Sequence, residues 1–209
     1  MYAKYIKRVI DIVIAFCGMV FLLPVFIAII FAIKLDSKGP AFFLQKRVGK
    51  GKKHFNILKF RTMSTSTPRD MPTHKLRYPD LYITRMGRFL RRTSLDELPQ
   101  ILNILKGDMS VIGPRPALWN QDDLVAERDK YGANDVLPGL TGWAQINGRD
   151  ELEIPEKAKF DGEYVKRMSF SFDVRCFFGT ILSIFRHEGV VEGGTGALVG
   201  KEKGETEAK

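Results

Sequence analysis

The sequence predicts an α+β protein that is mainly helical, and three observations lead to this fold class. An uncharged apolar run at residues 12–33 predicts a membrane helix. Two short strand-like runs joined by a Gly-Lys turn predict a small β-hairpin. Two later stretches repeat apolar residues at helical spacing. At 209 residues, the chain is long enough for one folded core.

The apolar run is long enough to cross a bilayer as a straight helix. Pro24 lies near its middle, where proline removes a helical N–H and clashes with the preceding turn. Basic residues flank both ends, whereas a spanning helix has its positive charge mainly at the cytoplasmic end. We therefore expect a re-entrant membrane helix over residues 1–38, kinked at Pro24. A single span, with the domain outside the cell, and a buried soluble helix are the alternatives.

The net charge of +9 points to an anionic partner, which is nucleic acid, anionic lipid headgroups or a phosphorylated substrate. Cys17 and Cys176 lie far apart in apolar stretches, which favours reduced thiols over a disulfide. The chain contains no P-loop, dinucleotide-binding or nucleophile-elbow motif, and its histidines lack metal-ligand spacing. Charge alone does not choose among the three partners.

The rest of the chain is expected to form one domain, 39–192, and a flexible tail, 193–209, rich in Gly, Lys and Glu. We expect one helix from Asp96 to Gly107 and another from Phe170 to Phe185. Arginines among the aromatic residues of the second helix favour a membrane surface as much as a core position. The hairpin strands are expected at residues 41–45 and 54–61, and a proline-rich loop at 64–80.

Asp96 and Glu97 are adjacent acids at the expected start of a helix. Acids favour helix N-termini, and Ser94 with Glu97 matches a capping box. Pro99 moves the expected cap to Asp96, because its missing N–H then falls in the first helical turn. Taken alone, the pair is most simply a helix cap.

Basic residues around the pair favour a second interpretation, a phosphate-binding site. These residues are Lys59, Arg61, Arg91, Arg92, Arg115 and Arg149. Lys59 and Arg61, two apart on the expected strand, would share a face. Cations near a helix N-terminus bind phosphate, and Mg²⁺ is held by few carboxylates together with substrate phosphates. For each arginine singly, a solvated charge or structural ion pair is the alternative.

Five segments, in order, resemble the small monotopic phosphoglycosyl transferases of the bacterial sugar transferase family, which are polyprenyl-phosphate hexose-1-phosphate transferases. The segments are KRVID at 7–11, KFRTM at 59–63, SLDELPQ at 94–100, GDMSVIGPRP at 107–116 and PGLTGWAQINGR at 138–149. They span nearly all of the chain from Lys4 to Gly189. One segment would be weak evidence, whereas five in order are specific.

The resemblance implies transfer of a sugar 1-phosphate from a UDP-sugar to polyprenyl (undecaprenyl) phosphate, with release of UMP. Asp96 would be the nucleophile that forms a covalent phosphosugar intermediate, and Glu97 would bind Mg²⁺ or act as a base. Asp96 and Glu97 would therefore also be the metal ligands. The residues implied at the substrate phosphates are Lys59, Arg91 and Arg115, together with Arg149, which matches less securely. Asp161 and Asp173 also match less securely.

The resemblance also implies catalytic helices, membrane-surface helices and a monotopic location at the bacterial inner (cytoplasmic) membrane, with the catalytic domain on the cytoplasmic face. The implied partners are anionic lipid headgroups and later glycosyltransferases of the same pathway, and nucleic acid is not among them. The family often has Ser before the membrane proline, where this chain has Leu23. Leucine cannot satisfy the carbonyl that the kink frees.

Residues 116–121 and 164–166 most resemble members that act in capsule synthesis. This favours an amino- or deoxy-sugar donor, such as a UDP-N-acetyl-6-deoxyhexosamine, and leaves glucose and galactose open. The competing hypothesis is a non-catalytic basic protein that binds anionic lipid or nucleic acid. It predicts salt-sensitive binding that survives the loss of Asp96 and Glu97.

Overall fold

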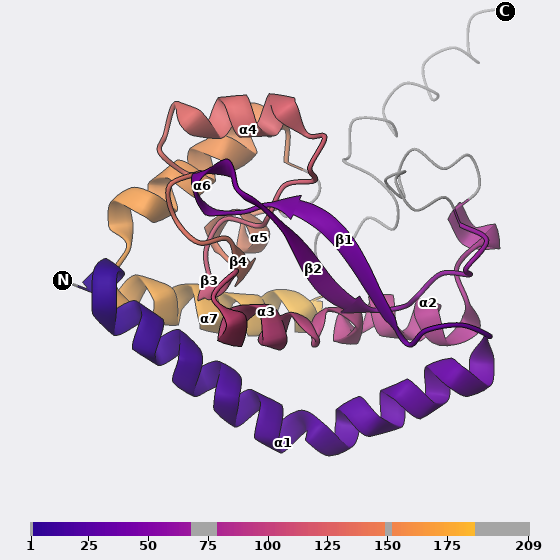
Figure 1. Ribbon diagram of the computed structural model, residues 1–209. Coiled ribbons are helices and arrows are strands. Elements are labelled where there is room, and N and C mark those ends of the chain that lie inside the picture. Colours follow the sequence, from indigo (N-terminus) through magenta and orange to yellow (C-terminus); the bar gives the residue numbers. More distant parts are fainter. Residues whose placement is uncertain (1, 68–78, 149–151, 187–209) are drawn as a thin grey trace, which may run out of the picture.

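The computed structural model describes residues 2–67, 79–148 and 152–186 (Figure 1). The described part is mainly helical with two small sheets, which confirms the predicted class. The helices are α1 (Lys7–Asp36), α2 (Arg85–Arg92), α3 (Gln100–Lys106), α4 (Asp122–Asp129), α5 (Trp143–Ile146), α6 (Ile154–Arg167) and α7 (Phe170–Arg186). The strands are β1 (Phe42–Val48), β2 (His54–Phe60), β3 (Ser110–Ile112) and β4 (Gly139–Thr141). The expected tail, 193–209, and most of the expected loop lie outside the described residues.

The predicted hairpin is present, with β1 and β2 antiparallel and Phe42 opposite Phe60. β1 extends to Val48, beyond the expected end at residue 45. Its last residues are held by tertiary contacts, because Arg47 donates to the carbonyl of Pro116 and Val48 is buried. The parallel pair of β3 and β4 was not predicted. Each strand has only three residues, too few for a sequence pattern to reveal.

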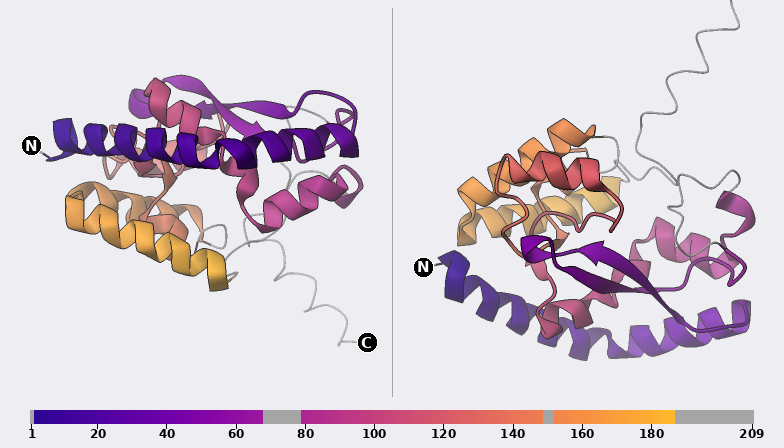
Figure 2. Two further views of the ribbon diagram at one scale, coloured as in Figure 1. Left: turned by 90° about the horizontal axis from the view of Figure 1, so that it is seen from below. Right: turned by 45° about the horizontal axis from the view of Figure 1, so that its top comes forward.

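α1 is a single helix that contains Pro24 and bends in its middle, with both ends on the side of the domain (Figure 1). Among the described helices, it is the one long and apolar enough to cross a membrane. Its inner side packs on α2, α3 and β3, and Ala15, Phe26 and Ile33 are buried there. Its outer side exposes large apolar residues, including Phe21 at 81%. Seen from below in Figure 2, α1, α2 and α7 lie across one face.

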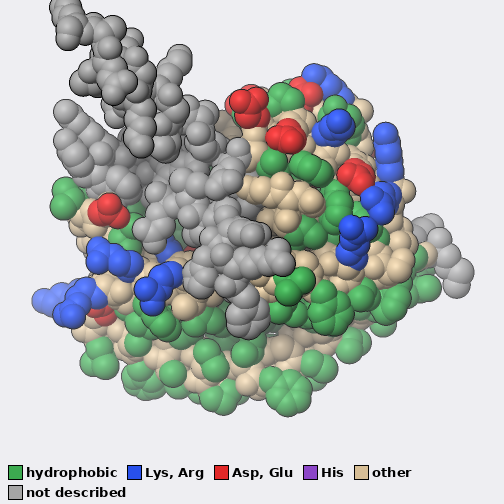
Figure 3. Space-filling view, turned by 180° about the vertical axis from the view of Figure 1, so that it is seen from behind, with side chains coloured by type: hydrophobic (Ala, Val, Ile, Leu, Met, Phe, Trp, Pro, Cys, Tyr) green, Lys and Arg blue, Asp and Glu red, His purple; other side chains and the backbone are tan. Residues whose placement is uncertain are grey.

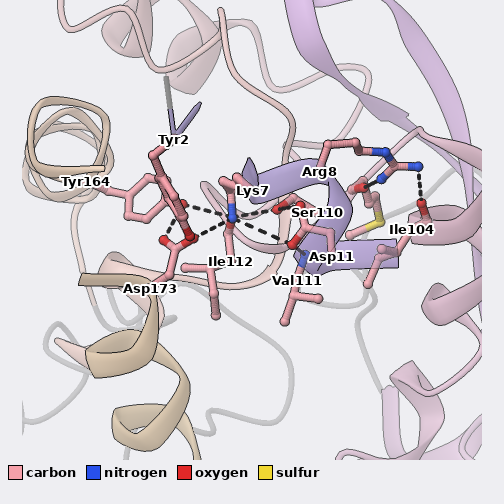
Figure 4. Close-up of polar contacts among 11 residues, drawn as sticks. Tyr2, Lys7, Arg8, Asp11, Ile104, Ser110, Val111, Ile112, Tyr164 and Asp173 are labelled. Atoms are coloured by element: carbon pink, nitrogen blue, oxygen red, sulfur yellow. Dashed lines mark hydrogen bonds and ion pairs between the residues drawn. The ribbon is translucent and has the colours of Figure 1, made fainter. Parts of the chain in front are cut away.

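A cluster of buried charges ties the N-terminal end of α1 to the domain (Figure 4). Lys7 Nζ lies 2.7 Å from Asp173 Oδ2 and 3.7 Å from Asp11 Oδ1. Asp11 accepts hydrogen bonds from Ser110 Oγ at 2.7 Å and from the backbone N–H of Val111 at 3.0 Å. We call Lys7, Asp11 and Asp173 the anchor cluster, because it joins α1, β3 and α7.

Two tyrosines complete the anchor cluster. Tyr2 and Tyr164 donate their hydroxyl hydrogens to Asp173 at 2.6 Å and 2.8 Å. Next to the cluster, Arg8 donates to the carbonyl of Ile104 at 2.8 Å at the end of α3. The carboxylates are thus buried only with full hydrogen bonding, as buried charges require.

The C-terminal end of α1 is tied to the same domain. Arg61 donates to the carbonyls of Ser37 and Lys38, just beyond the helix. Asp36 accepts the backbone N–H of Met86 in the first turn of α2 at 3.0 Å. Both ends of α1 therefore contact one folded unit.

Candidate active site

The acid pair lies in a 3₁₀ turn, Leu95–Glu97, and not in the first turn of a helix. The expected helix from Asp96 begins instead at Gln100, so the predicted cap at Asp96 is wrong. Ser94 is left-handed, with φ of 56°, and it turns the chain sharply after α2. Pro99 has no N–H to continue the hydrogen bonding from this turn into α3. The expected helix end is confirmed at Gly107, with φ of 102°.

Glu97 is held by two cations. Lys59 Nζ lies 2.8 Å from Glu97 Oε1, and Arg115 binds both carboxylate oxygens, with Nη1 3.1 Å from Oε2. Burial would raise the pKa of Glu97, but Arg115 and then Lys59 outweigh it and hold that pKa well below its ordinary value. Glu97 is therefore a fixed negative charge.

The pKa of its neighbour Asp96 is shifted in the opposite direction. Within the described residues its carboxylate accepts no hydrogen bond. Burial raises the pKa of Asp96, the charge of Lys59 opposes this rise, and the charge of Glu97 adds to it. Adjacent carboxylates whose pKa values are pushed apart are typical of sites that divide chemical roles between two acids.

Lys59 and Arg91 reach the acids from two elements that pack closely together. Lys59 belongs to β2, and Arg91 belongs to α2, where its Nε donates to Thr62 Oγ1 at 2.9 Å. A Cβ on Gly87 would lie 2.0 Å from the carbonyl oxygen of Thr62, so only glycine lets α2 approach this closely. The charge of Arg91 opposes the rise that burial causes in the pKa of Asp96.

Arg115 is supported from behind by a buried ion pair. Arg128 donates to the backbone carbonyl of Arg115 at 2.9 Å and to Asp161 Oδ2 at 2.6 Å. Arg128 is 4% exposed and Asp161 is 1% exposed. Asp161 therefore acts on Arg115 through Arg128 and is not among the side chains that surround the acids. The sequence analysis missed Arg128, because no pattern distinguishes a buried arginine on a charged helix.

The structure brings Lys59, Arg91 and Arg115 together around the acids. Asp173 instead belongs to the anchor cluster, and Arg92 is exposed on α2. Arg149 lies outside the described residues. Arg61 was expected to share a face with Lys59. This is wrong because β2 ends at Phe60 and Arg61 turns to the end of α1. Thr62, which holds Arg91, was also missed, although the matched segment 59–63 contains it.

The donor atoms fit a magnesium ion only together with a substrate. Across the described ranges, no group of three or more His, Cys, Asp or Glu side chains could hold a metal. Glu97 is already bound by Lys59 and Arg115, which leaves the Asp96 carboxylate open. Mg²⁺ is commonly bound by one or two carboxylates plus substrate phosphates, so this donor set is compatible with it.

Comparisons with known proteins identify the family of this chain. The family described as bacterial sugar transferase matches residues 2–187. The chain is 40% identical over 195 residues to the UDP-glucose:undecaprenyl-phosphate glucose-1-phosphate transferase of Escherichia coli (strain K12), covering 87% of this chain and 40% of that protein. A protein of the same name from Caulobacter vibrioides is 40% identical over 185 residues, covering 85% of this chain and 69% of its own length.

A third relative is named for a different sugar. It is the UDP-N-acetylgalactosamine-undecaprenyl-phosphate N-acetylgalactosaminephosphotransferase of Aeromonas hydrophila, 38% identical over 191 residues, covering 86% of this chain and 44% of that protein. The chain spans less than half the length of the Escherichia coli and Aeromonas relatives. Because the family match includes every described residue, the chain belongs to the bacterial sugar transferase family.

Proposed function

We propose that this protein transfers a sugar 1-phosphate from a UDP-sugar to polyprenyl phosphate through a covalent intermediate on Asp96. The proposal rests on the contrast between the two adjacent carboxylates of the Leu95–Glu97 turn. Asp96 accepts no hydrogen bond from the described residues, whereas Glu97 is bound by Lys59 and Arg115. The names of the relatives support the same donor and acceptor classes.

In the first step, an Asp96 oxygen attacks the phosphorus that bears the sugar. An oxygen–phosphorus bond forms, the bond to the bridging oxygen breaks, and UMP leaves with that oxygen. A carboxylate with a raised pKa and no hydrogen bond is more basic than a well-solvated one, which favours its use as a nucleophile. Lys59, Arg91 and Arg115 would offset the charge that develops on the phosphoryl oxygens.

In the second step, a phosphate oxygen of the polyprenyl phosphate attacks the same phosphorus. The bond to Asp96 breaks, the carboxylate is restored, and the polyprenyl diphosphosugar leaves. Splitting the reaction lets a soluble donor and a membrane-bound acceptor react in turn. The depressed pKa of Glu97 makes it a weak base, so we assign it the role of holding Lys59 and Arg115 in place.

Magnesium has a limited place in this proposal. The Asp96 carboxylate and the donor diphosphate would hold Mg²⁺, which would supply positive charge at the phosphates when bound. Glu97 contributes mainly through its two cations, since these already occupy its oxygens.

We also propose that α1 is re-entrant and that the protein is monotopic, on the cytoplasmic face of the inner membrane. Lys7 and Asp36, near opposite ends of α1, both bind the same domain, which supports this topology. A spanning α1 would put these contacts on opposite sides of the bilayer. Exposed apolar residues of α7, such as Phe170 and Phe178, support a helix at the membrane surface, where anionic headgroups are found.

The donor sugar and the pathway stay open within this proposal. The relatives are named for glucose and for N-acetylgalactosamine, so their names do not select one sugar. The amino- or deoxy-sugar inferred from residues 116–121 is one candidate. Capsule, exopolysaccharide and glycoconjugate synthesis each begin with such a transfer, and later glycosyltransferases would use the product.

The test is a UMP-release assay on the purified full chain with Mg²⁺, polyprenyl phosphate and a panel of UDP-sugars. We expect UMP release with at least one donor, and a mass increase of one sugar phosphate when the acceptor is omitted. Lipid binding without UMP release from any donor would instead favour the non-catalytic basic protein. Cysteines introduced near Lys4 and Lys38 should be labelled from the same side, whereas labels on opposite sides would contradict the re-entrant helix.

A further inference from the structure

α2 carries a stripe of arginines on its outer side. Arg85, Arg88 and Arg92 are all exposed, and their spacing of three and four residues places them on one helical face. Phe89, 45% exposed, lies beside them. In the part of the chain that the structure describes, none of the three arginine side chains takes part in an ion pair or hydrogen bond. The stripe is therefore three uncompensated positive charges.

Packing on the inner side of α2 fixes the orientation of the helix, so that the arginine stripe faces outward. Leu90 is fully buried, and Gly87 contacts the backbone of Thr62 so closely that no side chain would fit. Thr84 caps the helix by accepting the N–H of Gly87 at 2.9 Å. Like charges one turn apart repel each other, and a cation in the first turn opposes the helix dipole. The stripe thus costs stability unless an anion binds to it.

The stripe lies next to the apolar face of the molecule. α2 packs on the C-terminal half of α1, where Leu90 shares a buried cluster with Phe26, Ile29 and Ile33. Figure 3 shows Lys and Arg side chains directly above the broad hydrophobic band, at the end of the molecule formed by α2 and the end of α1. If that band enters the membrane, the stripe lies at the level of lipid phosphate groups.

The stripe also adjoins the active site. Arg91, on the same helix, turns inward to Thr62, and its charge acts on Asp96. Arg88 precedes Arg91 by one helical turn, and Arg92 follows it directly. A lipid phosphate bound between Arg88 and Arg92 thus needs only to pass to Arg91 to approach Asp96.

We propose that the arginine stripe of α2 receives the phosphate group of the acceptor lipid at the membrane surface and delivers it to Arg91. The inference rests on the proposed function, because it assigns the route of entry for the second substrate. The charge complementarity selects an anionic lipid headgroup, and the adjoining Arg91 selects the acceptor over the bulk anionic lipid. The stripe has no part in the first step, which uses the soluble donor.

The test compares Arg88→Gln/Arg92→Gln with Lys50→Gln/Lys53→Gln, which removes two exposed charges at the far end of the hairpin. Each full-length protein is assayed in neutral phosphatidylcholine vesicles that contain polyprenyl phosphate. Because each basic residue near an anionic headgroup favours binding, we expect the α2 variant to raise the acceptor KM roughly tenfold. Its kcat at saturating acceptor and its UMP release without acceptor should not change. Arg88→Lys/Arg92→Lys should restore most of the affinity.

Three outcomes would overturn the inference. An unchanged acceptor KM, or an equal rise in the hairpin variant, would show that the stripe has no special role. A defect that appears only as weaker binding to phosphatidylglycerol vesicles would assign the stripe to bulk lipid. Failure of the proposed function is separable, since it would appear as absent UMP release in the unmodified protein.

Discussion

The anchor cluster and the acid pair both place carboxylates beside cations, but they use their carboxylate oxygens differently. In the anchor cluster, both oxygens of Asp11 and both oxygens of Asp173 accept hydrogen bonds. In the acid pair, both oxygens of Glu97 are bound, whereas those of Asp96 accept none from the described residues. The two regions have similar residue types and differ in how many of their carboxylate oxygens accept hydrogen bonds.

The difference is the one expected between a structural site and a reactive one. Charges that are buried and fully hydrogen-bonded fix the geometry of the elements that carry them, here α1, β3 and α7. A carboxylate that is partly buried but left without hydrogen bonds costs stability, and it persists where its open oxygens are needed. Glu97 has features of both, because its saturated contacts hold the two cations that Asp96 would use.

The largest effect is expected for Asp96→Asn, which keeps the shape of the side chain and removes its charge. Turnover should fall by a factor on the order of 10⁴ to 10⁶, as for the loss of other catalytic nucleophiles. The folded-state pKa of Asp96 is raised, so ionised Asp96 destabilises the fold above that pKa. Asn removes this penalty, and the thermal midpoint at neutral pH should rise. UMP release and thermal unfolding measure the two effects.

Asp11→Asn is the matched control from the anchor cluster. It should lower the thermal midpoint, because the charged acceptor of Ser110 and Val111 is lost. Full activity in Asp96→Asn would remove Asp96 as the nucleophile. A lower thermal midpoint in Asp96→Asn would show that the Asp96 carboxylate stabilises the fold, as the Asp11 carboxylate does, and would contradict the difference between the two regions.

A smaller but substantial effect is expected for Lys7→Met, which breaks the anchor cluster. The change leaves two buried carboxylates without their cation and should cost about 3–5 kcal/mol of unfolding free energy. Denaturant unfolding in detergent measures the loss. Lys106→Met is the control, because Lys106 is exposed where it pairs with Asp108 and should cost less than about 1 kcal/mol.

Adding Asp173→Asn to Lys7→Met should recover part of the lost stability, since one uncompensated charge is removed. If Lys7→Met lowered the unfolding free energy no more than Lys106→Met does, the anchor cluster would not be what stabilises the packing of α1 on the domain.

The elements that sequence predicted are those that local patterns determine. The hairpin follows from alternation around a glycine turn, α7 from its apolar spacing, and the end of α3 from Gly107, which adopts a positive φ. The uniformly apolar run of α1 could not show which side is buried. That choice depends on α2, α3 and β3, which are far away in sequence. The 3₁₀ turn at Leu95–Glu97 depends on the left-handed Ser94, a residue type that rarely adopts this conformation.

The sequence also named most residues of the candidate site, but only the family resemblance gave Asp96 and Glu97 different roles. Asp96 and Glu97 are equivalent as adjacent acids, and only the reach of Arg115 and Lys59 shows that Glu97 is the bound one. Lys59 and Arg61 were expected to point to the same face of one strand, but β2 ends at Phe60, between them. Arg128 supports Arg115 across the fold, and no local pattern could have indicated it.

The smallest expected effect is a shift in pH dependence, and it tests the coupling inside the acid pair. The pKa of Asp96 is raised and that of Glu97 is depressed, so a falling pH protonates Asp96 first. UMP release without acceptor should therefore decline with falling pH at values above the ordinary aspartate pKa of about 3.9. Omitting the acceptor keeps the ionisation of its own phosphate out of the measurement.

Glu97→Gln should move this decline to lower pH while also lowering the rate. The charge of Glu97 raises the pKa of Asp96, and its removal also frees Lys59 and Arg115 to act on Asp96 alone. Glu127→Gln, which alters an exposed pair with Lys130, should leave the profile in place. A Glu97→Gln profile that coincides with the unmodified one would mean that the two acids titrate independently. Asp96 would then owe its raised pKa to burial alone.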